Sequence, residues 1–419
     1  MKIELSYGNS GLSVELPADV DVIRPRHTAG LPDEAAAIRA ALANPTGAAP
    51  LVAQVKPGDR VVVAHSDITR ATPNQRLLPV ILAELEAAGV RREDITLLNA
   101  LGTHRQQTPA ELRAMLGDFV VDHYRCLQHD AYNDAGLVSL GETSFGHPVR
   151  LNRRLLEADF KILTGFIEPH FFAGFSGGPK GVLPALAGAE SVLTNHGYAM
   201  IGDPRATWGV CEGNPLWEEM REMALKVSPS FLVNVTLNVE KQITGVFAGD
   251  VLAAHRLGRE FVREHAMVRV PQAYDVILTT NSGYPLDQNL YQTVKGMSAA
   301  SQVIRPGGAI IMAAACADGL PDHGLYAQLL AEAGSPDAIL AMLAQPGYCA
   351  QDQWQVQVQA TIQKKADVYV YSDGLSEAQI RRALFHPCRD IPATLQALIQ
   401  KHGPRVCVLP DGPLTIAYL

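Results

Sequence analysis

The chain has 419 residues, a formal net charge of −8, and a composition that is 47% hydrophobic and 19% charged. This length predicts two domains rather than one, and the composition is typical of a folded chain rather than a disordered one. The acidic charge argues against a nucleic-acid-binding protein, because that function needs a basic face that displaces counterions from phosphates.

The chain does not begin with a basic segment followed by a short apolar core, so we expect no secretory signal peptide. We also expect no membrane span, because no apolar run reaches about 18 residues. Six cysteines are scattered singly, without a CxxC pair. This spacing is typical of reduced thiols rather than of a disulfide framework or a zinc knuckle, and we expect a cytoplasmic protein.

The first half of the chain alternates predicted strands and helices. Residues 1–17 predict a strand, a turn and a second strand, because polar and apolar residues alternate. DRVVVAHSD and DITLLNALGTH each predict a buried strand that ends in a polar loop. NQRLLPVILAELEAAGV predicts an amphipathic helix closed by Gly89, and TPAELRAMLG a helix with Thr108 as its N-cap. Such alternation predicts a mostly parallel sheet covered by helices.

A second block of the same kind begins near PQAYDVILTTNSG and continues as helix, turn and strand in YQTVKGMSAASQVIRPGGAIIMAAACADG. DVYVYSDG and PRVCVLPDG predict further strands. We therefore expect two α/β domains with mostly parallel sheets and the active site in the cleft between them. Residues 1–270 would form the cofactor-binding and catalytic domain and residues 271–419 a substrate-capping domain, with the extreme C-terminus packing back on the first. Pro271 would belong to a hinge for domain closure.

Polar residues follow three predicted strands of the first domain. Asp67 and Arg70 lie in DITR, His104 in LGTH, and His170 in GFIEPH. Ligands of parallel α/β sheets bind at the carboxyl ends of the strands. We therefore expect these loops to converge on one crevice. On its own, DITR is equally well explained as a surface ion pair.

The segment GFIEPHFFAGFSGGPKG, residues 165–181, allows three interpretations: a phosphate cradle, a metal site or a glycine-rich turn. It is not a Walker A motif, because its glycines have the wrong spacing and no Ser or Thr follows Lys180. A single histidine in such a loop is more often structural than catalytic. Three of them, His104, His170 and His196, together with Lys180, favour metal binding or acid–base catalysis without deciding between the two.

The second domain offers further candidates. In LYQTVKG, Tyr291 and Lys295 are four residues apart and face the same side of a predicted helix, with Gln292 beside them. They would capture substrate or form a solvated helix face. Trp354, among the glutamines of QDQWQVQ, would wall a pocket or cap the core.

Taken together, DITR, LGTH, GFIEPHFFAGFSGGPKGVLPALAG, TNHG and LYQTVKG resemble the nickel-dependent lactate racemase family, in the same order and over nearly the whole chain. The block from Gly165 to His196 is the most specific part. The resemblance implies an isomerase that racemises or epimerises a 2-hydroxy acid, lactate or a related one, by hydride transfer through a 2-keto acid. A 2-hydroxy acid and the enzymes that build the cofactor would be its partners, without nucleic acid or membrane.

The resemblance also implies the cofactor, a nickel-pincer nucleotide (the nickel complex of pyridinium-3,5-bisthiocarboxylic acid mononucleotide). Lys180 would carry it covalently, His196 would bind nickel, and the glycines would make room for the nucleotide. His104 and His170 would be the acid–base pair, one on each side of the reacting carbon. The remaining implied contacts are Asp67, Thr69, Ser176, Gly177 and Gly178 with the cofactor, and Arg70, Tyr291, Gln292, Lys295 and Trp354 with the substrate.

Two other functions remain open on the residues alone. A hydrolase or lyase with a histidine-bound zinc would work without any group on Lys180. A non-catalytic carrier of the nucleotide would need Lys180 and His196 but neither His104 nor His170.

Overall fold

The structure is a computed structural model that describes residues 1–321 and 324–419. Contacts divide the chain into two compact units. The first unit comprises His27–Asn195 and Gly209–Arg263, and the second comprises Met1–Arg26, His196–Trp208 and Glu264–Leu419. Short N-terminal and internal segments therefore belong with the C-terminal part of the chain. A single division between residues 270 and 271, with Pro271 as a hinge, stays a prediction.

The first unit is built on a six-stranded sheet whose strands are parallel except at one edge. Its order is β13-β12-β9-β4-β5-β6, and only β13 runs antiparallel to its neighbour. The chain leaves the central strand β4 towards β5 and β6, then returns to β9 on the other side of β4. The strands are β4 (Val61–Ser66), β5 (Ile95–Ala100), β6 (Arg125–Gln128), β9 (Phe160–Phe166), β12 (Phe231–Leu237) and β13 (Ile243–Gly249).

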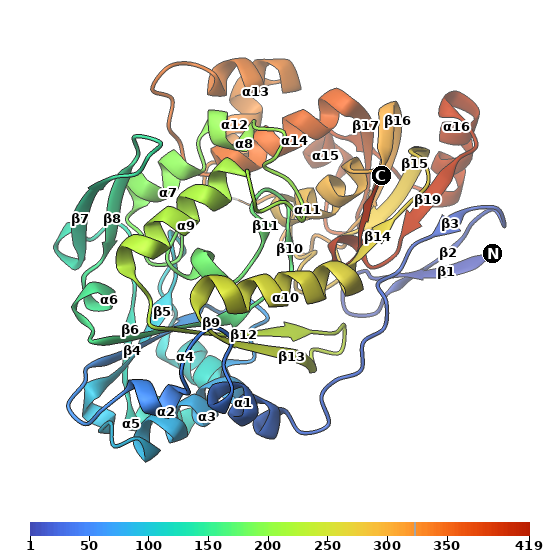
Figure 1. Ribbon diagram of the computed structural model, residues 1–419. Helices are drawn as coiled ribbons and strands as arrows, with labels where there is room; N and C mark the ends of the chain where they lie inside the picture. Colours follow the sequence, from blue (N-terminus) through green and yellow to red (C-terminus); the bar gives the residue numbers. More distant parts are fainter. Residues whose placement is uncertain (322–323) are drawn as a thin grey trace. The chain divides into compact units, whose positions relative to one another are not determined.

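Helices cover one face of this sheet, where Val61, Val63, Ile162 and Val233 join a continuous apolar cluster with the helices. In Figure 1 these helices, α1 to α5, lie together below the sheet. They are α1 (Glu34–Ala43), α2 (Leu51–Gln54), α3 (Asn74–Ala87), α4 (Pro109–Leu116) and α5 (Asp118–His123). The predicted N-cap of α4 is confirmed, since Thr108 and Glu111 form a reciprocal capping box.

The other face carries the glycine-rich segment. The 3-10 turn η3 (Gly178–Gly181), which contains Lys180, packs against β4, β9 and α9. The remaining elements of the unit are η1 (Arg92–Asp94), η2 (Asp134–Gly136), the hairpins β7 (Leu137–Glu142)–β8 (Pro148–Asn152) and β10 (Pro169–His170)–β11 (Gly174–Phe175), and the helices α6 (Arg153–Glu157), α7 (Ala189–Asn195), α9 (Pro215–Val227) and α10 (Val251–Ala266), the last three residues of which pass into the second unit.

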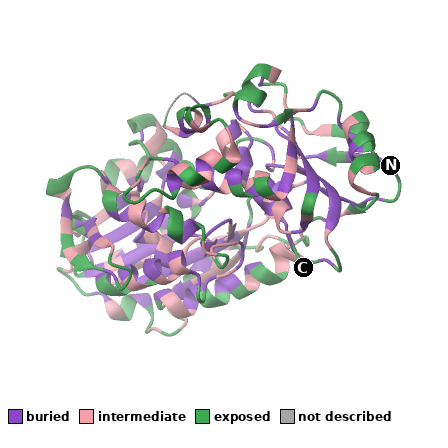
Figure 2. Ribbon diagram, turned by 90° about the horizontal axis from the view of Figure 1, so that it is seen from above, coloured by how far each residue is buried: buried purple, intermediate pink, exposed green. Residues whose placement is uncertain are grey.

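The second unit is built on a fully parallel sheet of order β18-β17-β16-β15-β19-β3. The strands are β3 (Asp21–Val22), β15 (Tyr274–Thr280), β16 (Ile304–Ala313), β17 (Ala366–Tyr371), β18 (His386–Pro387) and β19 (Val406–Leu409). In both units the central strands, such as β4 and β15, are buried along most of their length, while helices expose their outer sides (Figure 2). A mostly parallel α/β architecture, as predicted, is confirmed.

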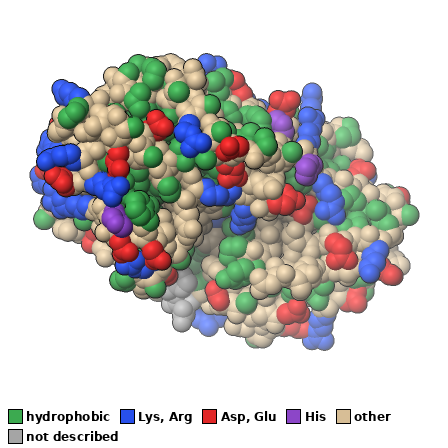
Figure 3. Space-filling model, turned by 90° about the horizontal axis from the view of Figure 1, so that it is seen from below, with side chains coloured by type: hydrophobic (Ala, Val, Ile, Leu, Met, Phe, Trp, Pro, Cys, Tyr) green, Lys and Arg blue, Asp and Glu red, His purple; other side chains and the backbone are tan. Residues whose placement is uncertain are grey.

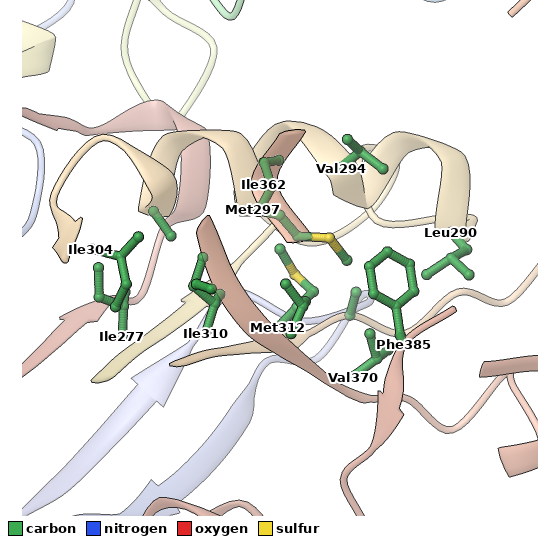
Figure 4. Packing of buried hydrophobic residues seen from close by; sticks show 14 of the residues in the cluster. Ile277, Leu290, Val294, Met297, Ile304, Ile310, Met312, Ile362, Val370 and Phe385 are labelled. Carbon is green, nitrogen blue, oxygen red and sulfur yellow. The ribbon is translucent and has the colours of Figure 1, made fainter. Parts of the chain in front are cut away.

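Helix α11 (Leu290–Ser301) packs on one face of this second sheet (Figure 4). Its Leu290, Val294 and Met297 face Ile310 and Met312 of β16. The face also carries α12 (Tyr326–Ala333), α13 (Pro336–Leu343) and α14 (Gln353–Lys365); α8 (Tyr198–Ile201) lies against α14, and α15 (Glu377–Arg382) next to β18. The opposite face is covered by α16 (Ile391–His402) and the predicted hairpin of β1 (Lys2–Leu5) and β2 (Leu12–Glu15). Strand β14 (Met267–Arg269) pairs with the C-terminal β20 (Ile416–Tyr418), which follows η4 (Gly412–Leu414).

The carboxyl edge of the second sheet is occupied by the N-terminal turn. Ser6 N donates to Pro410 O (2.8 Å), Gly8 N to Asp287 Oδ2 (2.8 Å) and Tyr7 Oη to Asp373 Oδ2 (2.8 Å). The strand order reverses between β15 and β19, where a parallel sheet usually binds its ligand. In this unit the chain itself fills that place.

On the face shown in Figure 3, Lys and Arg side chains lie among Asp and Glu side chains rather than in one continuous basic area. Within the described residues, no helix combines the length and the hydropathy needed to cross a bilayer.

Candidate active site

The carboxyl ends of three neighbouring strands of the first sheet carry the predicted catalytic loops. Asp67 follows β4, His104 follows β5 and His170 follows β9, and these strands are adjacent and parallel in the order β9-β4-β5. The strand order reverses between β4 and β9, which is where open α/β sheets form their ligand crevice. The three loops therefore leave the same edge of the sheet; their convergence on one crevice stays a prediction.

Asp67 and His104 form a hydrogen-bonded pair across two of these loops. Asp67 Oδ2 lies 2.5 Å from His104 Nδ1, while Asp67 Oδ1 accepts from Thr69 N (3.0 Å) and Thr69 Oγ1 (2.7 Å). Asp67 is buried and the side chain of His104 is 44% exposed. Both carboxylate oxygens of Asp67 are thus engaged, by His104 and by Thr69.

The charge state of Asp67 follows from these partners. Burial alone would raise its pKa, but the hydrogen bond to His104, the charges of His104 and Arg70, and the bond from Thr69 outweigh burial and lower the pKa to about 2. The carboxylate is therefore ionised at neutral pH and accepts the Nδ1–H of His104. The lone pair of a neutral His104 then lies on Nε2, where it can accept a proton.

Nδ1 of His170 accepts hydrogen bonds, whereas Nδ1 of His104 donates one. The donors to His170 are the backbone N–H groups of Ala173 (3.2 Å) and Phe172 (3.5 Å). The partners assign the lone pair to Nδ1, so a neutral His170 carries its proton on Nε2. Its ring also packs edge-on against Phe172, with centroids 4.5 Å apart. The two imidazoles thus present different Nε2 states: one accepts a proton and the other donates a hydrogen bond.

Lys180 lies close to the same aromatic ring. Its Nζ is 5.7 Å from the centroid of Phe172, and the residue is half-buried on η3. Phe172 therefore contacts both His170 and Lys180. The structure brings Lys180 and His170 together around one side chain, as the predicted site requires.

The glycines before Lys180 make room for protein side chains. A Cβ added to Gly177 would lie 2.5 Å from Asn234 Oδ1, and one added to Gly178 would lie 2.4 Å from the His255 ring. Gly178 N donates to Asn234 Oδ1 (2.8 Å) and Ser176 Oγ donates to Phe166 O (2.9 Å). These groups fix the loop that carries Lys180, a role that the interpretation as a nucleotide cradle missed. Contact of these three residues with a cofactor stays a prediction.

His255 and Asn234 are site-supporting residues that the sequence analysis did not identify. His255 Nε2 donates to Ser176 O (2.8 Å), and burial, reinforced by the charge of Arg259, lowers the pKa of His255 to about 3. It therefore stays neutral. The available signals were a polar residue inside the apolar strand FLVNVTL and a His–Arg pair four residues apart on the apolar face of α10.

The other predicted residues belong to the second unit. His196 is buried, and its ring lies edge-on to Trp354 with centroids 5.3 Å apart. Trp354 Nε1 donates to Tyr291 Oη (3.2 Å), and Lys295 Nζ donates to Gln292 Oε1 (2.8 Å) on α11. The structure thus groups His196, Trp354 and Tyr291, and it places Lys295 and Gln292 together on one helix.

Protein side chains alone do not build a metal centre in the described part of the chain: no group of three or more His, Cys, Asp or Glu side chains is arranged to hold an ion. His196 is a single imidazole beside an aromatic ring. Such a donor suits a metal that receives its other ligands from a bound organic group. Lys180 is half-buried, and its side-chain amine suits a covalent anchor for that group.

Comparison with known proteins decides the family. The description "Lactate racemase N-terminal domain" matches residues 7–209, and "Lactate racemase C-terminal domain" matches residues 270–416. The chain belongs to the lactate racemase family. The chain is 34% identical to the lactate racemase of Thermoanaerobacterium thermosaccharolyticum over 418 residues, covering 98% of this chain and 97% of the relative. It is also 34% identical to the lactate racemase of Lactiplantibacillus plantarum over 379 residues, covering 90% and 89%.

Solved structures agree on the fold of this lactate racemase family member. The lactate racemase apoprotein of T. thermosaccharolyticum superposes with a TM-score of 0.93 at 33% identity, covering 100% of both chains. A Thermotoga maritima protein reaches a TM-score of 0.69 at 20% identity, over 93% of this chain and 99% of that one, and supports the fold alone.

Proposed function

We propose that this protein is a racemase that interconverts the enantiomers of lactate or a closely related 2-hydroxy acid. The observation that carries the proposal is the pair of histidines with opposite Nδ1 partners, His104 on a carboxylate and His170 on two backbone N–H groups. Family membership supports the reaction class.

The cofactor in this proposal is the nickel-pincer nucleotide, bound covalently to Lys180 with His196 as the protein ligand of nickel. When bound, this group would accept the C2 hydrogen of the substrate as a hydride and return it. Plain deprotonation at C2 would face a high barrier, because the α-hydrogen of a hydroxycarboxylate is very weakly acidic. Asp67, Thr69, Ser176, Gly177 and Gly178 are proposed to surround it.

His104 and His170 handle the hydroxyl proton. His104 Nε2 takes the hydroxyl proton as the substrate is oxidised, and Asp67 stabilises the resulting imidazolium through Nδ1–H. His170 donates a hydrogen bond through Nε2–H to the oxygen on the other side of the reacting carbon, and the proton held by His104 returns to the oxygen when the 2-keto acid takes the hydride back. To accept a proton in the opposite direction, His170 must give up the backbone N–H groups at Nδ1 or turn its ring.

Cationic side chains are proposed to hold the substrate carboxylate. Arg70 is exposed at the end of the DITR loop, and Lys295 is half-buried on α11. A guanidinium can bind a carboxylate with two parallel hydrogen bonds. Tyr291, Gln292 and Trp354 would line the rest of the substrate site, with Trp354 and Tyr291 already fixed to each other by a hydrogen bond.

The test uses protein from a host that makes the nickel-pincer nucleotide. Intact mass and peptide mapping locate any group on Lys180, while chiral chromatography follows a panel of 2-hydroxy acids. We expect a nucleotide-sized addition on Lys180 and racemisation. Lys180→Arg should lose both, whereas Lys295→Met should keep the addition and raise the KM for substrate.

Each rival function predicts a different outcome. Racemisation by a chain with an unmodified Lys180 would contradict the proposed cofactor. Hydrolysis or elimination after zinc loading alone would indicate the zinc enzyme. A modified Lys180 in a protein that racemises none of the acids would indicate the carrier.

A further inference from the structure

Four glutamines alternate along α14 in the segment QVQVQ and just before it, and all four are buried. Gln353, Gln355, Gln357 and Gln359 are between 0% and 2% exposed. Glutamine is mostly an exposed residue, and a buried amide is costly unless it is hydrogen-bonded. A run of this kind on a helix therefore calls for partners.

The partners are backbone carbonyls of other segments. Gln353 Nε2 donates to His196 O (3.3 Å) and Gln357 Nε2 to Tyr198 O (2.8 Å). These two glutamines are four residues apart and share one face of the helix. Both hold the segment that contains His196.

The other two glutamines lie on the opposite side of the helix and hold different segments. Gln355 Nε2 donates to Tyr291 O, and Gln359 Nε2 donates to Ala383 O (2.8 Å). Gln359 also accepts from Tyr326 Oη at 2.5 Å. It contacts neither the His196 segment nor Tyr291 through these bonds.

The segment around His196 is shaped to receive these amides. Gly202 N donates to Tyr198 O (2.9 Å), so this carbonyl accepts both the helical bond of α8 and the amide of Gln357. A Cβ on Gly202 would lie 2.9 Å from Tyr198 O and 3.4 Å from Gln357 Nε2. Glycine thus leaves room for the glutamine at this carbonyl.

We propose that Gln353 and Gln357 are positioning residues for the metal ligand His196. The two amides fix its backbone, while Trp354, between them on α14, packs edge-on against its imidazole. Backbone and ring are therefore held by one turn of one helix. The inference rests on the proposed role of His196 in binding nickel. A histidine that supplies the single protein bond to a metal must be oriented by the residues around it.

The test compares three variants in one helix: Gln353→Met, Gln357→Met and, as the matched control, Gln359→Met. Each keeps an unbranched side chain of similar size and removes a buried amide that donates to a carbonyl. We expect hydrogen exchange of amides 197–202 in the cofactor-free chain to rise about tenfold in the first two and to stay unchanged in the control.

The second readout is nickel release from the cofactor-loaded chain into excess chelator. We expect release about 10- to 100-fold faster for Gln353→Met and Gln357→Met, with the group still on Lys180, and unchanged release for Gln359→Met. If Gln357→Met does not fold, Gln353→Met carries both measurements.

Equal acceleration of nickel release in the control, or no change in amides 197–202, would overturn the inference. A failure of the proposed function looks different. There the unsubstituted chain would carry neither nickel nor a group on Lys180, while the exchange experiment on the cofactor-free chain would still report whether the glutamines hold the His196 segment.

Discussion

The two imidazoles of the proposed site differ in what faces Nδ1. A carboxylate faces His104, and two backbone N–H groups face His170. The carboxylate accepts a hydrogen bond from Nδ1 of His104, whereas Nδ1 of His170 itself accepts from the two N–H groups. The two neutral rings therefore present different Nε2 atoms, a lone pair on His104 and an N–H on His170, and the two directions of the reaction use unlike starting states.

Asp67→Asn tests this difference. An asparagine cannot stabilise the imidazolium of His104 and can impose the wrong tautomer, so we expect kcat/KM to fall on the order of 10²- to 10⁴-fold. Rates are normalised to the amount of group carried on Lys180. Asp159→Asn, which removes a surface pair with Arg60, is the control and should change little.

The decrease of kcat/KM in Asp67→Asn should be equal for the two enantiomers of the substrate. Enantiomers have equal free energies, so the equilibrium constant is one and kcat/KM must match in the two directions. The asymmetry of the histidines can appear only in kcat and KM taken separately. Unequal kcat/KM values would show that the product is not the mirror image of the substrate.

Two substitutions test the roles of the two ring nitrogens of His170 separately. The Oδ1 atom of asparagine can replace Nδ1 as acceptor of the Phe172 and Ala173 N–H groups, whereas glutamine reaches towards the position of Nε2. We expect His170→Asn to be inactive but as stable as the parent, and His170→Gln to be inactive and less stable by about 1–3 kcal/mol, because the N–H groups lose their acceptor. Thermal unfolding and racemisation assays check both. Activity retained in either variant would contradict a proton-handling role.

At the scale of single elements, an ion cluster fixes the start of β15. Asp275 is buried and accepts from Arg405 Nη2 (2.9 Å) and Nε (3.1 Å) and from Arg305 Nε (2.6 Å). The bonds from Arg405, joined by Arg305, outweigh burial and hold the pKa of Asp275 well below its usual range. The cluster ties β15 to the start of strand β16, which contains Arg305, and to Arg405, the residue directly before β19.

We expect Asp275→Asn to lower the free energy of unfolding by about 2 kcal/mol at pH 7, less than for a fully buried pair because both arginines are partly exposed. Because the pKa of Asp275 is lower in the folded chain, its ionised carboxylate contributes fully to stability at pH values above the unfolded pKa, near 3.8. This contribution is lost as the pH falls towards the folded-state pKa. The difference from the parent should therefore narrow below about pH 4. Asp367→Asn, which breaks an exposed pair with Lys401, should cost under about 1 kcal/mol in the same urea titrations. A difference that widens in acid would contradict the account.

Element prediction succeeded where local chemistry decides. The Thr108 cap, the helix closed near Gly89 and the strand DRVVVAHSD depend on neighbouring residues alone, and the structure has them. The role of Gly177 and Gly178 depends on Asn234 and His255, which occupy the space where their Cβ atoms would lie and which are distant in sequence. Local pattern could not reveal that their missing side chains make room for protein.

At the scale of the whole molecule, the second compact unit gathers segments that are far apart in the sequence. The stretch 196–208 packs with the C-terminal unit through α14, although its neighbours on both sides belong to the first unit. The glutamines of α14 and the N-terminal turn on the second sheet each join segments far apart in sequence. Spacing within one segment carries no information on such pairings, so neither was predictable.

The central claim is that the protein racemises lactate without exchanging the C2 hydrogen with water. The most direct measurement incubates cofactor-loaded protein with one lactate enantiomer deuterated at C2 and analyses the products by chiral separation and mass. We expect both enantiomers, each retaining its deuterium. Racemisation with deuterium lost to water would contradict hydride transfer, and a product that remains a single enantiomer would contradict the function itself.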